Sequence, residues 1–419
     1  MEPVVGIIAE YNPFHNGHVY HIQEAKCRSG ALCAVAVMSG NFVQRGEAAL
    51  ADKWARAEAA VRGGADLVLE LPFPYACNNA EWFARGGIGV LRGLGCVTHL
   101  AFGCESETPE TLETAAQVFA TEPQAFRQAL RAFLDQGDSY PKARANALRM
   151  LIGEVADVIE TPNNILAVEY LKQCRLQNWS PMPVPVVRKG ASYADPMLPA
   201  HGSVASASAI RAQFGADDRC SASRVLQAFL PEASLNMMRK CGVSQNALEA
   251  GMHPLLLSKI LSGRPEELER IFSAGEGLQN KLKRAAMQAE TTEELIRLVK
   301  SKRYTETRIR RLLIHTLFGL TKDDPAVQPG APLYARILAM NEQGTALLRR
   351  IKKEETATIP VLTAPHRELE KESALRELMR WDYMASDFYH LIRGESLQKQ
   401  TDYVKNPVYV KKFNICDKK

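Results

Sequence analysis

The first half of the chain alternates short apolar runs with stretches of helical character, and this alternation constrains the fold more than any other feature. The apolar runs cover 4–9, 32–38, 65–71, 99–102 and 184–187. The helical stretches between them cover 17–28, 50–61, 80–94, 112–134 and 165–175. Strands that crossover helices bury on both faces have this continuous apolar character. The pattern predicts an α/β fold with a doubly wound, Rossmann-like parallel sheet.

The second half of the chain has a different composition. After about residue 215 the strand-like runs stop, and segments rich in Leu, Glu, Lys, Arg and Ala dominate. We therefore expect two domains, an α/β domain over 1–218 and a mostly α-helical domain over 219–419. A length of 419 residues is enough for two or three domains with proper apolar cores.

Charge divides between the same two halves. Residues 1–220 carry 19 Lys and Arg against 23 Asp and Glu, whereas residues 221–419 carry 33 against 24. An acidic front half joined to a basic back half favours a catalytic module attached to a part that binds a polyanion. A basic surface that is merely solvated fits the same numbers, so charge alone leaves both interpretations open.

Composition also excludes several classes of protein. The longest apolar stretches, such as 31–38, fall far short of the ~20 residues that cross a bilayer, so we expect no membrane protein. The nine cysteines are odd in number and scattered without a C-x-x-C pair, which argues against a disulfide framework and against a zinc cage. Because no secretory leader is recognisable, we expect a cytoplasmic protein with reduced thiols.

The segment A-E-Y-N-P-F-H-N-G-H at 9–18 joins the first predicted strand to the first predicted helix. In an open α/β sheet, ligands bind beyond the carboxyl ends of the strands, where the next helix offers free N–H groups to phosphate. His15 and His18 are three residues apart, so both rings can face an α-phosphate whose charge grows during nucleophilic attack. A structural pair or two metal ligands fit the same spacing. A metal site would need a third ligand of similar kind, and since we recognise no nearby cluster of Cys, His and carboxylate residues, we expect no metal site.

A second segment, S-A-S-A-I-R at 206–211, follows a strand-like run and the loop 188–190. Ser206 and Ser208 at a helix start can cap backbone amides or contact phosphate oxygens. Arg211 can place its guanidinium fork on a β- or γ-phosphate. Taken alone the segment is an ordinary helix cap, and its interest lies in its combination with H-x-G-H.

The two segments together resemble the H-x-G-H nucleotidylyltransferase superfamily, whose members attack the α-phosphate of ATP and release pyrophosphate. A closer resemblance, to the tRNA(Met) cytidine acetate ligase family, covers nearly the whole chain. It rests on G-I-I-A-E-Y-N-P-F-H-N-G-H at 6–18, M-S-G-N-F-V-Q-R-G-E at 38–47, A-D-L-V-L-E-L-P at 65–72, F-G-C-E at 102–105, P-N-N-I-L at 162–166 and S-A-S-A-I-R at 206–211. The chain departs conservatively from the usual pattern at Ala48, where proline is common, and at Ala167, where glycine is common.

The resemblance implies an activity and its substrates. Acetate would attack the α-phosphate of ATP to give acetyl-adenylate and pyrophosphate, and the acetyl group would pass to N4 of the wobble cytidine of elongator tRNA(Met). The product would be N4-acetylcytidine. Carboxylate attack on phosphorus needs positioning and charge neutralisation but no covalent enzyme nucleophile, which fits the residues present. Mg²⁺ is expected because it normally accompanies ATP.

The resemblance also assigns a nucleotide site, with His15 and His18 as the catalytic pair. Its first part is the run Ile7, Ile8, Ala9, Glu10, Tyr11, Asn12, Pro13, Phe14, His15, Asn16, Gly17, His18, Val19 and Tyr20. Its other positions are Gly103, Asn163, Arg188, Lys189, Ser206, Ser208 and Arg211. Several of these positions also have simpler explanations: a turn for Gly103, a helix cap for Asn163 and a solvated surface for Arg188 and Lys189.

Four further polar residues, Gln44, Arg45, Lys53 and Arg56, follow the second predicted strand. Lys53 and Arg56 are three apart on a predicted helix and share a face, which suits an anion held above the sheet edge. An exposed basic face fits the same spacing. We therefore expect these residues to contribute to acetate, pyrophosphate or tRNA binding, outside the catalytic core.

The densest basic stretch covers 297–311, with seven Lys and Arg against only Glu306. An apolar stripe that starts at Ile309 predicts a helix with its arginines outside, and Tyr304 offers an aromatic plane to an unpaired base. The residues expected to contact RNA are Lys302, Arg303, Arg308 and Arg311. A solvated helix surface is the alternative.

Two other functions remain open from the sequence. A small-molecule adenylyltransferase of the same superfamily would use the front half equally well, although the long basic second half argues against it. A nucleotide-regulated RNA-binding protein without turnover would not need both His15 and His18.

Overall fold

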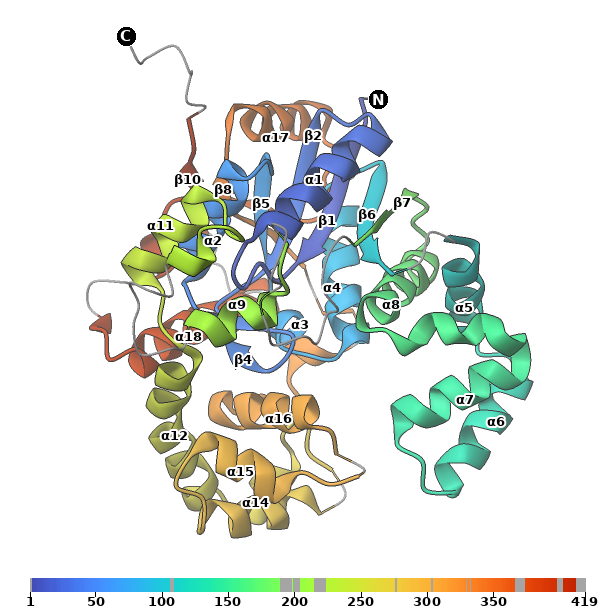
Figure 1. Ribbon diagram of the computed structural model, residues 1–419, viewed down its shortest axis with the longest axis vertical. Coiled ribbons are helices and arrows are strands. Elements are labelled where there is room, and N and C mark those ends of the chain that lie inside the picture. Colours follow the sequence, from blue (N-terminus) through green and yellow to red (C-terminus); the bar gives the residue numbers. More distant parts are fainter. Residues whose placement is uncertain are drawn as a thin grey trace.

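The computed structural model (Figure 1) is centred on a mostly parallel sheet with helices packed on it, which confirms the predicted fold class. It describes residues 2–105, 109–188, 198, 204–214, 224–275, 277–302, 304–328, 330–331, 333–365, 374–397 and 402–411. The buried apolar residues of both halves of the chain form one continuous core.

The main sheet has eight strands. They are β1 (Val4–Ala9), β2 (Cys33–Ser39), β5 (Leu67–Leu71), β6 (His99–Cys104), β7 (Met182–Val187), β8 (Ala335–Met340), β9 (Val361–Leu362) and β10 (Val408–Tyr409). The order is β10-β8-β5-β2-β1-β6-β7, with β9 also paired to β8. The pairs among β5, β2, β1, β6 and β7 are parallel, whereas β8 runs antiparallel to β5. The short strands β3 (Phe42–Val43) and β4 (Glu47–Ala48) form a separate hairpin.

The first half of the chain supplies the helices that cover the parallel strands. They are α1 (Asn16–Ser29), α2 (Lys53–Arg62), α3 (Phe73–Ala76), α4 (Ala80–Gly93), α5 (Pro109–Thr121), α6 (Gln124–Asp135), α7 (Tyr140–Ile152), the 3-10 helix η1 (Gly153–Glu160), α8 (Pro162–Leu176) and α9 (Ala207–Phe214). Helix α1 contacts β1, β2, β6 and β7, and α4 packs against α8 and β1. Gly6 of β1 faces α4, where a Cβ would lie 2.8 Å from Leu91, so close packing of this helix requires glycine.

One helix predicted from the sequence is two helices in the structure. The expected stretch 112–134 is divided between α5 and α6, because Glu122 has a left-handed backbone with φ +40° and Pro123 then starts α6. Helix α7 and η1 follow, where the sequence pattern gave no expectation. Helices α5 to α7 extend away from the sheet as one group (Figure 1).

The second half is mostly helical, as expected, but it also returns strands to the sheet. Its helices are α11 (Glu232–Cys241), α12 (Gln245–Ser262), α13 (Pro265–Glu269), α14 (Leu278–Ala286), α15 (Thr292–Val299), α16 (Glu306–Phe318), η2 (Pro325–Val327), α17 (Glu342–Glu354), α18 (Ala374–Ile392) and η5 (Asp402–Val404). Strands β8, β9 and β10 then extend the sheet beyond β5, so the expectation that strands stop near residue 215 is wrong. The expected boundary at 218/219 lies outside the described residues.

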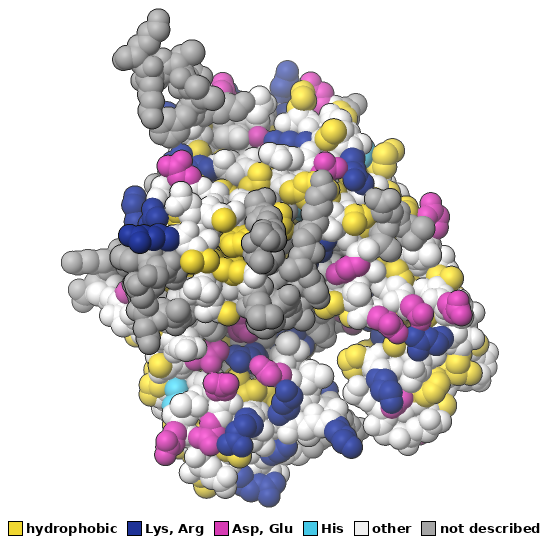
Figure 2. All heavy atoms as spheres, in the orientation of Figure 1, with side chains coloured by type: hydrophobic (Ala, Val, Ile, Leu, Met, Phe, Trp, Pro, Cys, Tyr) yellow, Lys and Arg dark blue, Asp and Glu magenta, His cyan; other side chains and the backbone are white. Residues whose placement is uncertain are grey.

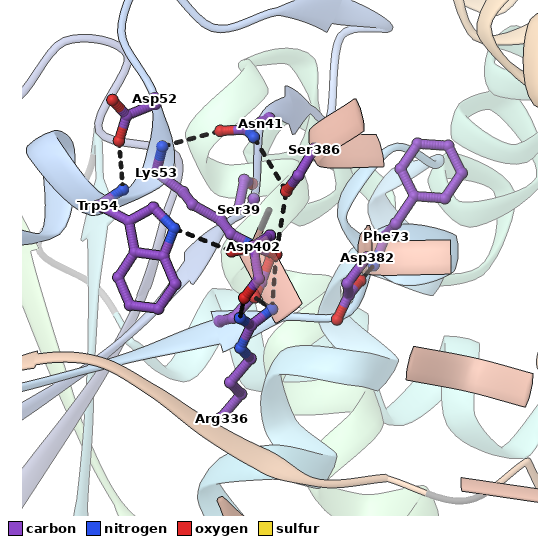
Figure 3. A network of polar contacts seen from close by, with 12 residues as sticks. Ser39, Asn41, Asp52, Lys53, Trp54, Phe73, Arg336, Asp382, Ser386 and Asp402 are labelled. Carbon is purple, nitrogen blue, oxygen red and sulfur yellow. Dashed lines mark hydrogen bonds and ion pairs between the residues drawn. The ribbon is translucent and has the colours of Figure 1, made fainter. Parts of the chain in front are cut away.

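A buried cluster of paired charges joins this returning segment to the front half (Figure 3). Asp402 accepts hydrogen bonds from Lys53 at 2.6 Å and from Arg336 of β8 at 2.8 Å. Glu70 of β5 accepts from the same two cations at 2.5 and 3.1 Å. Trp54 and Ser386 also donate to Asp402, at 2.9 and 3.0 Å. The cluster explains how a strand can carry a fully buried arginine at its second position.

Lys53 and Arg56 therefore do not form an anion site or an exposed basic face, and that expectation is wrong. Both side chains are fully buried. Lys53 is neutralised by the two carboxylates of the cluster. Arg56 donates to backbone carbonyls, including that of Glu10 at 2.6 Å and that of Ala51 at 2.9 Å. Arg56 thereby supports the loops that follow β1 and β2, whereas Lys53 connects β5 to the segment that carries Asp402.

Candidate active site

A cavity of about 190 Å³ opens where β1, β6 and β7 end. Strand β2 pairs with one side of β1, and β6 pairs with the other side. The cavity therefore lies at the switch point at which open α/β sheets bind ligands. The cavity brings together these residues of the predicted nucleotide site: Ile7, Ile8, Ala9, Glu10, Tyr11, Asn12, His15, Gly17, His18, Tyr20, Gly103, Asn163, Arg188, Ser208 and Arg211.

The two histidines are held by the backbone at the start of α1. His15 is the N-cap residue, and its Nδ1 accepts the N–H of Gly17 at 3.1 Å. Nδ1 of His18 accepts the N–H of His15 at 3.2 Å, and the two rings stack with centroids 3.8 Å apart. An imidazole that accepts at Nδ1 carries its proton on Nε2 when it is neutral. The helix start therefore sets the tautomer and leaves Nε2–H as the donor of each ring.

Both imidazoles are neutral at pH 7. Burial, reinforced by the charges of Arg188 and Arg211, lowers the pKa of His15 to about 3. Burial, followed by the neighbouring His15, His21 and Arg188, lowers the pKa of His18 well below its ordinary value. Neutral N–H donors can hydrogen-bond phosphate oxygens as negative charge develops, without transferring a proton.

One end of the cavity carries arginines. Arg211 donates to the backbone carbonyl of Asn12 at 3.0 Å and to the hydroxyl of Ser208 at 3.3 Å. Arg45 donates to the same hydroxyl at 3.4 Å. Two guanidinium groups that share a serine hydroxyl suit an anion with several oxygens, such as the β- and γ-phosphates of a nucleotide.

A buried carboxyl lies beside these arginines. Glu10 accepts the backbone N–H of Gln44 at 2.8 Å. Burial raises the pKa of Glu10, although the charges of Arg45 and Arg211 act in the opposite direction. Glu10 thereby ties the loop after β1 to the loop that carries Gln44 and Arg45.

The opposite wall carries Gly103, Asn163 and Arg188. Gly103 lies inside β6, so a turn does not explain it, and a Cβ there would meet only the Arg188 side chain at 3.7 Å. Asn163 donates to Glu105 at 2.5 Å. The N-cap of α8 is Thr161, so Asn163 is not the helix cap. Arg188 lines the cavity directly after β7 and is not a solvated surface residue.

Some predicted site residues lie behind the cavity wall. They are Pro13, Phe14, Asn16, Val19 and Ser206, while Lys189 lies outside the described residues. Phe14 is fully buried against the Tyr11 ring. The side chain of Asn16 donates to the backbone carbonyl of Ala228 at 3.0 Å. The Ser206 hydroxyl accepts the N–H of Ala209 at 3.0 Å, so the helix-cap explanation holds for Ser206, whereas Ser208 faces the cavity.

The cavity also contains residues that sequence analysis did not select. These are His21, Phe83, Leu166, Tyr170, Val186, Val187, Val204 and Ala207. His21 continues the spacing of three from His15 and His18, and that signal could have found it. Phe83 comes from α4 and Tyr170 from α8, and no local motif indicates that these helices meet at the cavity.

The basic stretch before and within α16 is only partly exposed. Lys302 is exposed, and Arg303 lies outside the described residues. Tyr304 is buried, with the guanidinium of Arg308 4.7 Å from its ring centroid, so it cannot stack on a base as expected. Arg311 is half-buried and donates to the backbone carbonyl of Gln44 at 3.2 Å. The expectation that Arg311 stays outside is therefore wrong, because it braces the cavity loop.

Figure 2 shows Lys and Arg side chains over α14 to α16, interspersed with acidic ones. Within the described part of the chain, no group of three or more His, Cys, Asp or Glu side chains could hold a metal ion. No helix in that part is long and apolar enough to span a bilayer.

Comparisons with known proteins agree with this geometry. The model of the family "HIGH Nucleotidyl Transferase" matches residues 1–403. A tRNA(Met) cytidine acetate ligase of Acetivibrio thermocellus is 37% identical over 394 residues, which cover 92% of this chain and 94% of that protein. The enzyme of the same name from Thermoanaerobacter sp. strain X514 is 38% identical over 412 residues, covering 96% of this chain and 98% of that protein.

Solved structures give the same result. The crystal structure of apo TmcAL from Thermotoga maritima matches with a TM-score of 0.90 and 32% identity, over 98% of this chain and 100% of that chain. The structure of the same protein bound to alpha-thio ATP matches with a TM-score of 0.87 and 31% identity over the same shares. The chain belongs to the HIGH Nucleotidyl Transferase family and, within it, to the tRNA(Met) cytidine acetate ligases.

Proposed function

We propose that this chain is an ATP-dependent, AMP-forming ligase that activates acetate and acetylates N4 of the wobble cytidine of elongator tRNA(Met). The observation that carries the proposal is the stacked pair His15 and His18, whose tautomers are set by the backbone at the switch point of the sheet. The names of relatives that match nearly the whole chain supply acetate and tRNA(Met) as the substrates.

In the first step, an acetate oxygen attacks the α-phosphorus of ATP. The bond to the pyrophosphate oxygen breaks, the electron pair leaves with pyrophosphate, and acetyl-adenylate remains. Charge builds on the α-phosphate oxygens, where the Nε2–H groups of His15 and His18 can donate. Arg45 and Arg211 neutralise the leaving pyrophosphate from their end of the cavity.

In the second step, N4 of the cytidine attacks the acetyl carbonyl carbon. The nitrogen loses a proton, the bond to AMP breaks, and N4-acetylcytidine and AMP are released. None of the described cysteines is needed as a nucleophile, and burial raises the pKa of thiols such as Cys77, to about 12. The chemistry therefore depends on placing the reactants rather than on a covalent enzyme intermediate.

Nucleotide binding involves both walls of the cavity. We assign the run 7–20 to the nucleotide, either as cavity lining or as the support behind it, together with Gly103, Asn163, Arg188, Ser206, Ser208 and Arg211. Mg²⁺ would be carried by the triphosphate itself, since the nearby Glu10 already accepts from Gln44 and no acidic cage accompanies it among the described residues.

The helical part of the second half is proposed as the tRNA-binding region. Of the residues expected to contact RNA, Lys302 is exposed and Arg308 is partly exposed, and Arg303 belongs to the same stretch of sequence. Arg311 connects that stretch to the cavity loop through the carbonyl of Gln44. We divide the chain by sequence into a catalytic part, 1–218, and a tRNA-binding part, 219–419, in a cytoplasmic enzyme.

One assay tests the proposal. The protein is incubated with ATP, labelled acetate and total tRNA, and both pyrophosphate and label on RNA are measured. Pyrophosphate together with labelled cytidine is expected. An adenylylated small molecule with unlabelled RNA would instead identify a small-molecule adenylyltransferase. Binding of tRNA without ATP consumption would identify a nucleotide-regulated RNA-binding protein.

A further inference from the structure

Three buried polar atoms of residues that line the cavity have no hydrogen-bond partner among the described residues. They are the hydroxyl of Tyr11, Nδ2 of Asn12 and Nε2 of His21. Tyr11 is 1% and Asn12 2% exposed. A buried polar group without a partner costs free energy, and in the lining of a cavity a bound ligand can supply the missing partner.

The surroundings of Asn12 and His21 place them at different ends of the cavity. Asn12 accepts Arg211 at its backbone carbonyl at 3.0 Å and the N–H of Leu50 at Oδ1 at 2.9 Å. Its Nδ2 thus belongs to the arginine end. The His21 ring makes a hydrogen bond with the backbone of Phe102, beside Gly103 and Arg188. His21 thus belongs to the wall that we assign to the nucleoside.

Tyr11 is placed at neither of these ends. Its backbone is left-handed, with φ +50°, and its ring meets the His18 ring edge-on at 4.8 Å and the Phe14 ring at 4.9 Å. The His15 and His18 rings stack, and a Cβ on Gly17 would lie 2.8 Å from the His15 ring and 3.3 Å from Val204, in the segment that leads to Arg211. Tyr11 therefore lies on the His18 side. Burial raises the pKa of Tyr11, so its hydroxyl keeps its proton and acts as a donor.

In-line displacement at phosphorus requires the nucleophile and the leaving group on opposite sides of the α-phosphate. The arginine end suits the leaving pyrophosphate, so the carboxylate must approach from the other side of the histidine pair. The Tyr11 hydroxyl lies on that side, and it is a buried neutral donor without a partner among the described residues. The cavity lining also includes the Phe83 ring, which is buried and apolar.

We propose that the Tyr11 hydroxyl binds the carboxylate of acetate, donating a hydrogen bond to the oxygen that does not attack. The attacking oxygen forms the new bond to phosphorus, and no proton moves at Tyr11 during the step. The inference rests on the proposed function and assigns its acyl-substrate subsite. Asn12, in contrast, serves the leaving pyrophosphate.

The experiment measures acetate-dependent exchange of labelled pyrophosphate into ATP, without tRNA, for the wild type, Tyr11→Phe and Asn12→Ala. For Tyr11→Phe we expect KM for acetate to rise roughly 10- to 100-fold, as for loss of a hydrogen bond to a charged group, with KM for ATP within about two-fold. For Asn12→Ala we expect KM for pyrophosphate to rise and KM for acetate to stay. KM does not depend on the amount of folded enzyme, so partial unfolding does not obscure the result.

The matched control is Tyr383→Phe, which deletes another buried hydroxyl without a described partner, away from the cavity. Its KM for acetate is expected to match that of the wild type. An unchanged KM for acetate in Tyr11→Phe, or a rise only in KM for ATP, would overturn the inference and leave the proposed function intact. If the wild type shows no acetate-dependent exchange under conditions where it binds ATP, the proposed function itself fails.

Discussion

The buried charge cluster and the cavity both lie at the main sheet, and they differ in whether their buried polar groups have partners within the protein. In the buried charge cluster, Lys53, Arg336, Glu70 and Asp402 are paired with one another at 2.5 to 3.1 Å. In the cavity, buried donors and acceptors such as the Tyr11 hydroxyl lack partners among the described residues, and the histidines are kept neutral. Each charge of the cluster has a counter-charge within the protein, although Nε of Arg336 has no described hydrogen-bond partner, whereas we propose that a ligand completes the cavity.

The difference teaches which buried polar residues to assign to function. Lys53 looks like an anion ligand by residue type and position, yet its contacts show that it connects two parts of the fold. Tyr11 looks like an ordinary aromatic residue, yet its buried hydroxyl has no partner among the described residues, and we propose it for a substrate. The contacts that a side chain already makes separate the two roles better than its chemical type does.

The largest effect is expected for His18→Ala. Loss of one of two donors to the α-phosphate should lower the rate of pyrophosphate release about 10²- to 10³-fold. The affinity for tRNA should stay nearly the same, because the ring lies in the cavity and not on the basic stretch. Stopped assays of pyrophosphate and a filter-binding measurement with tRNA check both statements. Unaltered turnover would remove His18 from the mechanism.

The next effect, on stability, is expected for Asp402→Asn in the charge cluster. The change leaves Lys53 and Arg336 to share the single charge of Glu70, so unfolding should become easier by about 3 kcal/mol. The folded fraction should keep the wild-type KM for ATP. Urea unfolding provides the measurement, and Asp323→Asn, at an exposed ion pair with Arg270, provides a control that should change little. Equal stability of both variants would contradict the cluster's structural role.

The pH dependence of stability should have opposite signs in the two regions. The pKa of His15 falls from 6.5 to about 3 on folding, so between these values the unfolded chain binds more protons and stability rises with pH. Beside the charge cluster, burial and the charge of Glu70 raise the pKa of Asp382 from 3.8 to about 7. Stability associated with Asp382 therefore falls as pH rises across that window.

Unfolding by urea between pH 4.5 and 7.5 tests these signs. His15→Asn, which retains an N-cap acceptor, should remove a rising component of up to about 1.4 kcal/mol per pH unit. Asp382→Asn should remove a falling component of similar size. Profiles parallel to that of the wild type in both variants would show that these groups do not titrate as described.

The smallest effect, on tRNA binding, is expected for the accessible charges of Lys302 and Arg308, which belong to neither the cluster nor the cavity. Replacing Lys302 and Arg308 together by alanine should weaken tRNA binding about five-fold at moderate salt and reduce its salt dependence, because fewer counterions are released. Pyrophosphate exchange without tRNA should not change. Arg264→Ala, at an exposed arginine elsewhere in the same half, serves as the control. An identical salt slope in the double variant and the wild type would assign the stretch to the solvated surface.

The sequence predicted the parts of the fold that depend on local pattern. The parallel strands appear as continuous apolar runs, and H-x-G-H falls at the first strand-to-helix junction. Strand β8 was missed because Arg336 interrupts its apolar run, and its burial depends on Glu70 and Asp402, 266 and 66 residues away. Strands β9 and β10 have two residues each, too few for any periodicity.

The candidate site shows the same limit. Residues next to H-x-G-H were found because they share one loop, and Ser208 and Arg211 were found through a second motif. Phe83 and Tyr170 reach the cavity only because α4 and α8 pack together, which no local pattern specifies. For Arg311, helical periodicity predicted the buried stripe beside it but not the loop that covers its own side chain.

The place of Asp402 in the chain has a consequence for biosynthesis. A ribosome that has translated 400 residues has already produced every side chain of the cavity. Asp402, whose carboxylate pairs with both Lys53 and Arg336, and the edge strand β10 are not yet made at that point. The newborn chain therefore has only Glu70 as counter-charge for two cations until Asp402 emerges, and chaperone contact is most needed in that interval.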